Sequence, residues 1–110
     1  MSGDGLRGVA DVDVLQAEID AWARRTFPDS NLRSKFAHLR DELDEILERP
    51  GDSHEWADAL ILLIQAAAFA GHSFSGLLSA VRAKHEINLG RTWGKPDERG
   101  VVKHVLEGGE

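Results

Sequence analysis

The most constraining feature of the sequence is residues 54–70, HEWADALILLIQAAAFA, which start with two acidic side chains and then become almost wholly apolar. From residue 59 to residue 70 the only polar side chain is Gln65. A helix that is apolar around most of its circumference needs partners on several sides. These twelve residues would extend only about 18 Å, whereas the hydrocarbon core of a bilayer is about 30 Å thick. We therefore expect a central core helix and not a membrane span.

A first helix is predicted before this stretch by apolar residues at helical spacing. It runs from Asp11 to about Phe27, and its apolar stripe is Val12, Leu15, Ile19 and Trp22. We expect Trp22 to be a core residue, with stacking on a ligand base as the alternative. Residues 1–10 contain three glycines and little that could pack, so they are expected to be a flexible segment.

The second helix is the most clearly periodic segment of the chain. Its stripe is Leu32, Phe36, Leu39, Leu43 and Ile46. Ser30 or Asn31 can cap its start, and Pro50-Gly51 ends it. Asp52 or Ser53 can cap the central helix, which Gly71 closes. Because so few residues join these two helices, we expect them to be adjacent and antiparallel.

A fourth helix is predicted from the Ser73 cap to about Leu89, with the stripe Phe74, Leu77, Leu78 and Val81. After Trp93 the chain is rich in glycine and charge, and no strand pattern is evident. We expect one helical domain over residues 11–93 and an extended tail over residues 94–110. The fold class expected from this pattern is all-α.

Composition narrows the function classes. A chain of 110 residues offers too few other helices to cover the central one, so a second copy is expected to bury part of it, as a dimer or a dimer of dimers. The net charge of −6 argues against direct nucleic-acid binding. Cysteine is absent, and the N-terminus lacks the basic start and apolar run of a signal peptide. We expect a cytoplasmic protein with no membrane partner.

Four carboxylates, Glu42, Glu45, Glu55 and Asp58, are placed by the helical pattern at the margin between two adjacent helices. Glu42 and Glu45 lie about 60° and 120° to one side of the Leu39 stripe. Such a cluster would repel itself or take up protons unless a cation lay within it. Oxygen ligands suit Mg²⁺ or Mn²⁺. We therefore favour a metal site.

Structural alternatives exist for each acid taken singly. Glu55 follows Asp52 at the spacing of a capping box, so its carboxylate could close the helix start. Glu42 and Glu45 could pair with Arg49 or Lys35 as surface ion pairs do. These alternatives leave Asp58 unexplained, because an unpaired charge at the start of an apolar helix is costly.

A second group of polar residues follows the apolar stripe of the fourth predicted helix. Lys84, Asn88 and Arg91 recur at spacings of four and three, so they share a face while the helix lasts. Two cations and an amide suit phosphate oxygens. The alternative is a solvated basic helix end favoured by the helix dipole.

Together the two patterns resemble the signature of the MazG-like, all-α nucleoside triphosphate pyrophosphohydrolase superfamily. The resemblance covers about residues 15–93 and is carried by Glu42-x-x-Glu45, Glu55-x-x-Asp58 and Lys84-x-x-x-Asn88-x-x-Arg91-x-Trp93. Its small phage members, which act on dGTP and dATP, are the most similar. One departure is that only nine residues separate Glu45 from Glu55, fewer than is usual, which leaves less of a loop to close over a substrate.

The resemblance implies a four-helix MazG-like bundle that hydrolyses a nucleoside triphosphate to the monophosphate and pyrophosphate. It implies two or three Mg²⁺ (or Mn²⁺) ions held by the four acids, with Glu42 and Glu45 as candidates for the general base. It also implies that Lys84, Asn88 and Arg91 bind the phosphates.

The substrate implied by the resemblance is a purine deoxynucleotide such as dGTP or dATP. A pyrimidine such as dUTP or dCTP is the first alternative. The second is a non-catalytic helical oligomerisation module in which the acids only keep the protein soluble. Metal-dependent hydrolysis separates the enzyme from the module, and a panel of nucleotides ranks the bases.

Overall fold

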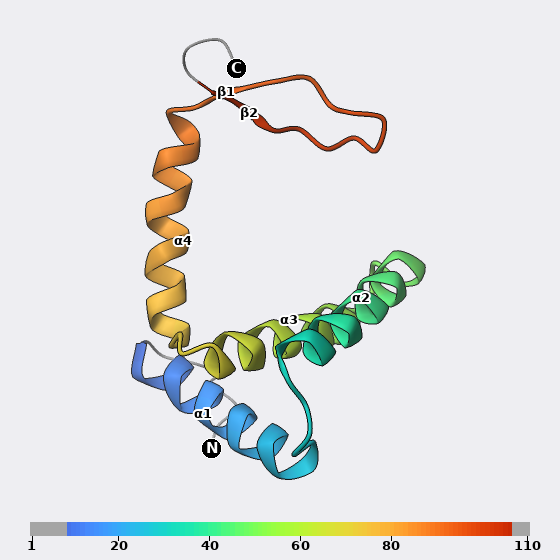
Figure 1. Cartoon of the computed structure of the whole chain (residues 1–110), viewed down its shortest axis with the longest axis vertical. Helices are drawn as coiled ribbons and strands as arrows, with labels where there is room; N and C mark the ends of the chain where they lie inside the picture. The colour runs from blue at the N-terminus through green and yellow to red at the C-terminus, as the bar shows by residue number, and fades with distance from the viewer. Residues whose placement is uncertain (1–8, 107–110) are drawn as a thin grey trace. The chain divides into compact units, whose positions relative to one another are not determined.

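The computed structural model describes residues 9–106 and confirms the expected all-α class. Within them lie four helices and two short strands: α1 (Val9–Thr26), α2 (Leu32–Glu48), α3 (Ser53–Phe69), α4 (Phe74–Leu89), β1 (Thr92–Trp93) and β2 (His104–Val105) (Figure 1). Helix α1 begins two residues before the predicted start. The rest of the expected flexible segment, residues 1–8, and the last four residues of the expected tail lie outside the described residues.

The helix boundaries follow from local capping chemistry. Asn31 caps α2 through a reciprocal pair of hydrogen bonds with Ser34, and the Asp52 carboxylate accepts from the His54 N–H at the start of α3. At the end of α3, Gly71 adopts a φ of 96°, which returns the next N–H to the Ala67 carbonyl in a Schellman motif. These caps agree with the sequence prediction.

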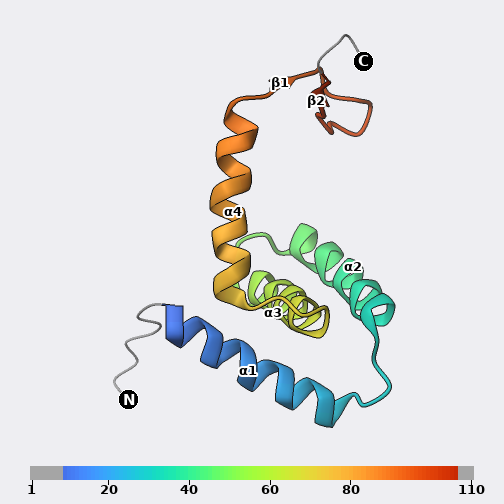
Figure 2. The same cartoon turned by 60° about the vertical axis from the view of Figure 1, so that its left-hand side comes forward.

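The described chain forms two compact units, one ending at Leu77 and one beginning at Leu78. In the first unit, α3 packs against both α1 and α2. Helices α2 and α3 lie side by side and run antiparallel, as predicted (Figures 1 and 2). The buried apolar core of this unit comes from all three helices: Ala23, Ile46, Ala59, Leu62, Ile64 and Ala66.

Polar side chains of α1 bind the break between α3 and α4. The buried Gln16 amide donates to the Ile64 and His72 carbonyls, and its oxygen accepts from the Phe74 N–H at 2.8 Å. The Asp13 carboxylate accepts from the N–H and hydroxyl of Ser75 at 2.9 and 2.7 Å. The bonds from Phe74 and Ser75 satisfy N–H groups that the start of α4 leaves without helical partners.

The buried face of α2 is rotated from the predicted stripe. Lys35, Glu42 and Ile46 are buried, whereas Phe36 and Leu43 are 38% and 48% exposed. The prediction took the most hydrophobic positions of α2 as its buried face. In the structure, the side of α2 that packs against α3 is partly polar. An apolar face of α2 therefore stays uncovered within one copy of the chain.

The second unit contains two short strands that the sequence analysis did not predict, and only β2 lies in the predicted tail. Strands β1 and β2 pair antiparallel, with Thr92 opposite Val105 and Trp93 opposite His104. The loop between them is held by Asp97, whose carboxylate accepts from the N–H groups of Arg99 and Val101. Two-residue strands are too short to show an alternating pattern, so no such pattern could predict them.

Among the described residues, no single helix is long and apolar enough to cross a membrane. Helices α3 and α4 meet the length and composition requirement only when taken together across the break between them.

Candidate active site

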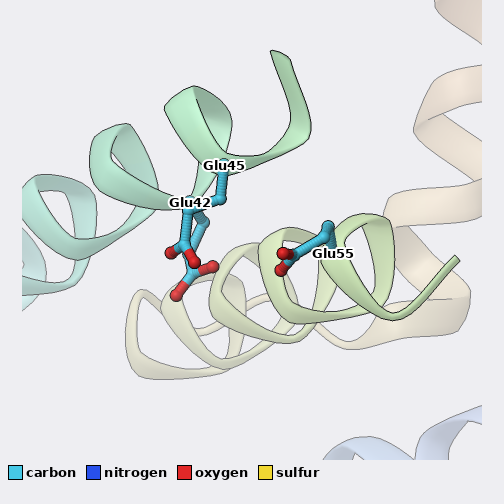
Figure 3. Close-up of side chains that lie close together, drawn as sticks. All are labelled: Glu42, Glu45 and Glu55. Carbon is cyan, nitrogen blue, oxygen red and sulfur yellow. The ribbon is translucent and has the colours of Figure 1, made fainter. Parts of the chain in front are cut away.

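Three of the four predicted acids converge where α2 meets α3. Glu42, Glu45 and Glu55 each present a carboxylate oxygen within 4.8 Å of the others (Figure 3). Glu42 and Glu45 are three residues apart on α2 and point toward α3, while Glu55 points toward them from the first turn of α3. The short antiparallel connection brings the end of α2 beside the start of α3. This cluster of three acids is hereafter called the carboxylate cluster.

Electrostatic crowding is evident at Glu45. The negative charge and close approach of Glu42, and then partial desolvation, raise the pKa of Glu45 above its ordinary value of 4.5, and the charge of Asp58 adds to the effect. Like charges at this distance disfavour full ionisation. A divalent cation among these oxygens would relieve the repulsion.

Glu42 is only 9% exposed, and its two oxygens have different surroundings. One lies 3.2 Å from the imidazole of His38, and the other is buried without a hydrogen-bond partner among the described residues. A buried carboxylate oxygen without a donor is costly. It is therefore available as a ligand, and oxygen-only donors fit Mg²⁺ or Mn²⁺.

The structural alternatives for these acids are largely not realised. Glu55 is 8% exposed and lies 3.7 Å from Arg49, while the side chain that caps α3 is that of Asp52. Lys35 donates to Gln65 and not to an acid of the cluster. Two contacts therefore compete with a metal ion for these acids: the long Arg49–Glu55 pair and the contact of His38 with one oxygen of Glu42.

Asp58 is placed differently from the other three acids. It is exposed, so burial does not penalise its charge as the sequence argument assumed. It lies outside the carboxylate cluster as defined by ligand distance but close enough for its charge to act on Glu45. With Glu42 it lines a pocket of about 750 Å³.

This pocket lies between α1, α2, α3 and the loop that joins α1 to α2. Beyond the two acids its lining includes Trp22, Phe27, Lys35, His38, Ile61 and Gln65. Its volume is within the range of sites for small molecules and cofactors, and mostly apolar walls with a few polar groups are typical of them. We call it the α1–α3 pocket.

The prediction of Trp22 as a core residue is wrong. Its side chain is 48% exposed, lines the α1–α3 pocket and meets Phe27 edge to face at 5.4 Å. The residue is the last of an apolar stripe, at the end of α1 where the neighbouring helices no longer cover it. Sequence reasoning also missed Lys35 and His38 as pocket residues, because both look like surface positions on an amphipathic helix.

The predicted phosphate-binding residues lie in the second unit. Lys84 and Asn88 are in α4, whereas Arg91 follows the helix end and lies 3.4 Å from His104 of β2. The three residues therefore do not form one continuous helical stripe. The Asn88 carbonyl accepts from the Trp93 indole, and its side-chain oxygen is buried without a partner among the described residues.

Comparison with known proteins places this arrangement in a family. A model of the dATP/dGTP pyrophosphohydrolase family matches residues 15–110. The chain belongs to this dATP/dGTP pyrophosphohydrolase family. A dATP/dGTP diphosphohydrolase of cyanophage S-2L is 37% identical over 98 residues, which are 87% of this chain and 90% of the relative. A dATP/dGTP diphosphohydrolase of Salmonella phage PMBT28 is 37% identical over 102 residues; the match covers 92% of this chain but 33% of that longer protein.

A solved structure agrees with this family assignment. It is the cyanophage S-2L MazG-like pyrophosphohydrolase bound to dGDP and three catalytic Mn²⁺ ions per active site. The two chains superpose with a TM-score of 0.71 at 34% identity, over 91% of this chain and 99% of the other. The resemblance to the MazG-like superfamily, and the hydrolase class that it implied, are confirmed.

Proposed function

We propose that this member of the dATP/dGTP pyrophosphohydrolase family hydrolyses a purine deoxynucleoside triphosphate, dGTP or dATP, to the monophosphate and pyrophosphate. The observation that carries the proposal is the carboxylate cluster at the edge of the α1–α3 pocket, which joins a cation site to a space for a nucleoside. The family match and the two phage diphosphohydrolases support the purine over the pyrimidine alternative.

The metal ligands of the proposal are Glu42, Glu45, Glu55 and Asp58. Mg²⁺ or Mn²⁺ ions at these carboxylates would neutralise the triphosphate and activate an attacking water. The orphaned oxygen of Glu42 and the raised pKa of Glu45 support a cation in this place. Glu42 and Glu45 are the candidates for accepting the proton of the water as it attacks the α-phosphorus.

The phosphate ligands of the proposal are Lys84, Asn88 and Arg91. The positive side chains of Lys84 and Arg91 would stabilise the charge that develops on the leaving pyrophosphate. Asn88 would contact phosphate through its side-chain NH₂ group, because its oxygen and the phosphate oxygens are all acceptors. The family match extends through all three positions.

The decisive experiment is a panel of canonical nucleotides incubated with Mg²⁺ and scored for pyrophosphate against phosphate release. Pyrophosphate from dGTP or dATP is the expected result. Glu45→Gln should lower kcat at least about 100-fold, because it removes a charged ligand. The control is Asp44→Asn, which removes an exposed charge one residue away. Equal loss in both variants, or release of phosphate alone, would contradict the proposal.

We also propose that a second copy covers the apolar faces of α2 and α3. Within one copy, Trp56, Leu60 and Leu63 recur on one side of α3 and are exposed, as are Phe36 and Leu43 on α2. Large apolar side chains left exposed at helical spacing are typical of faces that a partner covers. The oligomer would be a dimer or a dimer of dimers working in the cytoplasm.

Light scattering with in-line chromatography tests this assembly. The wild-type protein should elute as an oligomer, and Leu60→Glu should shift it toward the monomer because a charge would be buried in the interface. Asp41→Lys, which changes a charge at an exposed position of α2, should leave the mass unchanged. A monomeric wild-type protein would contradict the proposal.

A melting temperature that millimolar Mg²⁺ does not move would favour the non-catalytic module.

A further inference from the structure

Gln65 is the one polar residue in the apolar part of α3, and the structure gives it a partner. Its side-chain oxygen accepts a hydrogen bond from the Lys35 ammonium at 3.2 Å. Both residues are buried, at 5% and 6% exposure, and both line the α1–α3 pocket. The same ammonium lies 5.2 Å from the centre of the Phe69 ring, a second favourable contact that holds it in place.

This pairing determines which end of the Gln65 amide faces Lys35 and which end is left for another partner. A protonated lysine has three N–H donors and no acceptor, so only the amide oxygen can face it. The amide nitrogen must then point away from Lys35. Turning the amide over would place its N–H groups against the ammonium and lose the hydrogen bond.

The Gln65 amide nitrogen keeps access to solvent. It has no hydrogen-bond partner among the described residues, yet it is not one of the fully buried atoms left without a partner, which are in Glu42 and Asn88. A donor on the wall of an otherwise largely apolar pocket is the kind of group that sets the orientation of a bound ligand.

The position of Gln65 along α3 suits the base of a nucleotide. It lies seven residues after Asp58, so about 10 Å separates the two along the helix axis. That separation is on the scale of the distance in a nucleotide from the phosphate to the far edge of the base. Trp22 and Phe27 add flat apolar surface to the same pocket.

We propose that Gln65 donates its amide N–H to the 6-oxo group of a bound purine, and that Lys35 is the positioning residue that holds the amide in this orientation. The inference rests on the proposed function and adds to it a preference among purines. Guanine carries an acceptor at position 6, whereas adenine carries an amino donor there. Two donors facing each other leave both unpaired, so the 6-oxo base is favoured.

Deoxyinosine triphosphate and dATP isolate this contact, because both lack the 2-amino group and they differ at position 6 and the adjoining N1. The wild-type protein should have a kcat/KM about tenfold higher for dITP than for dATP, the value of one hydrogen bond gained and one clash avoided. The ratio is measured on one protein sample, so a lower folded fraction cancels from it.

Three variants test the two roles. Lys35→Met keeps the length of the side chain but frees the amide to rotate, so the ratio should fall toward one. Gln65→Met removes the donor and should have the same effect. Gln65→Glu presents an acceptor and should reverse the preference toward dATP. Arg25→Met is the control, since it removes a charge from the last turn of α1 outside the pocket lining; its ratio should match that of the wild type.

The outcomes separate the inference from the proposed function. A wild-type ratio near or below one would overturn the inference while leaving purine hydrolysis intact. So would an unchanged ratio in Lys35→Met or Gln65→Met, because a purely structural pair would alter stability and not selectivity. If the wild-type protein hydrolysed no purine nucleotide, the proposed function itself would fail.

Discussion

His38 lies 3.2 Å from one oxygen of Glu42, one helical turn away on α2, and so fixes the side chain of the most buried acid that α2 contributes to the carboxylate cluster. This contact leaves the second oxygen of Glu42 free of protein donors among the described residues. A partner of this kind orients a metal ligand without touching the ion. The arrangement makes the metal site sensitive to a residue that is not itself one of the proposed ligands.

We therefore predict that His38→Ala raises the Mg²⁺ concentration needed for half-maximal activity by about tenfold, the lower end for loss of such a partner. The measurement is a metal titration of pyrophosphate release at saturating nucleotide. His54→Ala is the control, because His54 is almost fully exposed beside Asp52. If both variants titrated like the wild type, His38 would not orient Glu42.

Arg49 is the positive group nearest to Glu55 and competes with a metal ion for its carboxylate. Their atoms are 3.7 Å apart, and the arginine side chain is 70% exposed. Exposed ion pairs contribute at most about 1 kcal/mol. We predict that Arg49→Ala lowers metal-free stability by less than that and tightens Mn²⁺ binding by up to about fivefold, measured by calorimetric titration. Weaker binding would instead indicate that Arg49 belongs to the substrate site.

The bond network between Asp13 and Ser75 predicts a pH dependence of stability. The Ser75 hydroxyl, and then its N–H, lower the pKa of Asp13 below the ordinary value of 3.8. Because the folded pKa is depressed, the contribution is fully present above pH 3.8 and is lost as the pH falls through the folded pKa. The stability difference between wild type and Asp13→Asn should therefore shrink as urea unfolding is moved from pH 6 to pH 3. A difference that stayed constant, or one matched by Glu18→Gln, would contradict this assignment.

The end of α3 depends on a backbone conformation that other residues seldom adopt. Gly71 has a φ of 96°, and an added Cβ would meet no atom within 4 Å. Gly71→Ala should therefore destabilise the protein through backbone strain alone, by about 1–2 kcal/mol in denaturant unfolding. Gly51→Ala, also at an uncrowded position but without a positive φ, should have little effect. Equal effects of the two substitutions would exclude the strain explanation.

The carboxylate cluster could be predicted in part, and for a physical reason. The i, i+3 spacing places Glu42 beside Glu45 on α2, and the short connection returns Glu55 to the same level on α3. The exposed fraction of each acid could not be predicted from these spacings. Asp58 looked like a buried charge in an apolar helix, but it is exposed, because it lies where the three helices leave the α1–α3 pocket open.

The sequence by itself determined the four helices of the described chain, their caps at Asn31, Asp52 and Gly71, and the level at which the acids meet. These features depend on hydrogen bonds and spacings within a few residues. Only the tertiary structure decided that Trp22 lines a pocket, that Lys35 is buried against Gln65, and which side of α2 faces α3. Those outcomes depend on how whole helices rotate against one another, and that rotation is set by the combined packing of residues far apart in the chain.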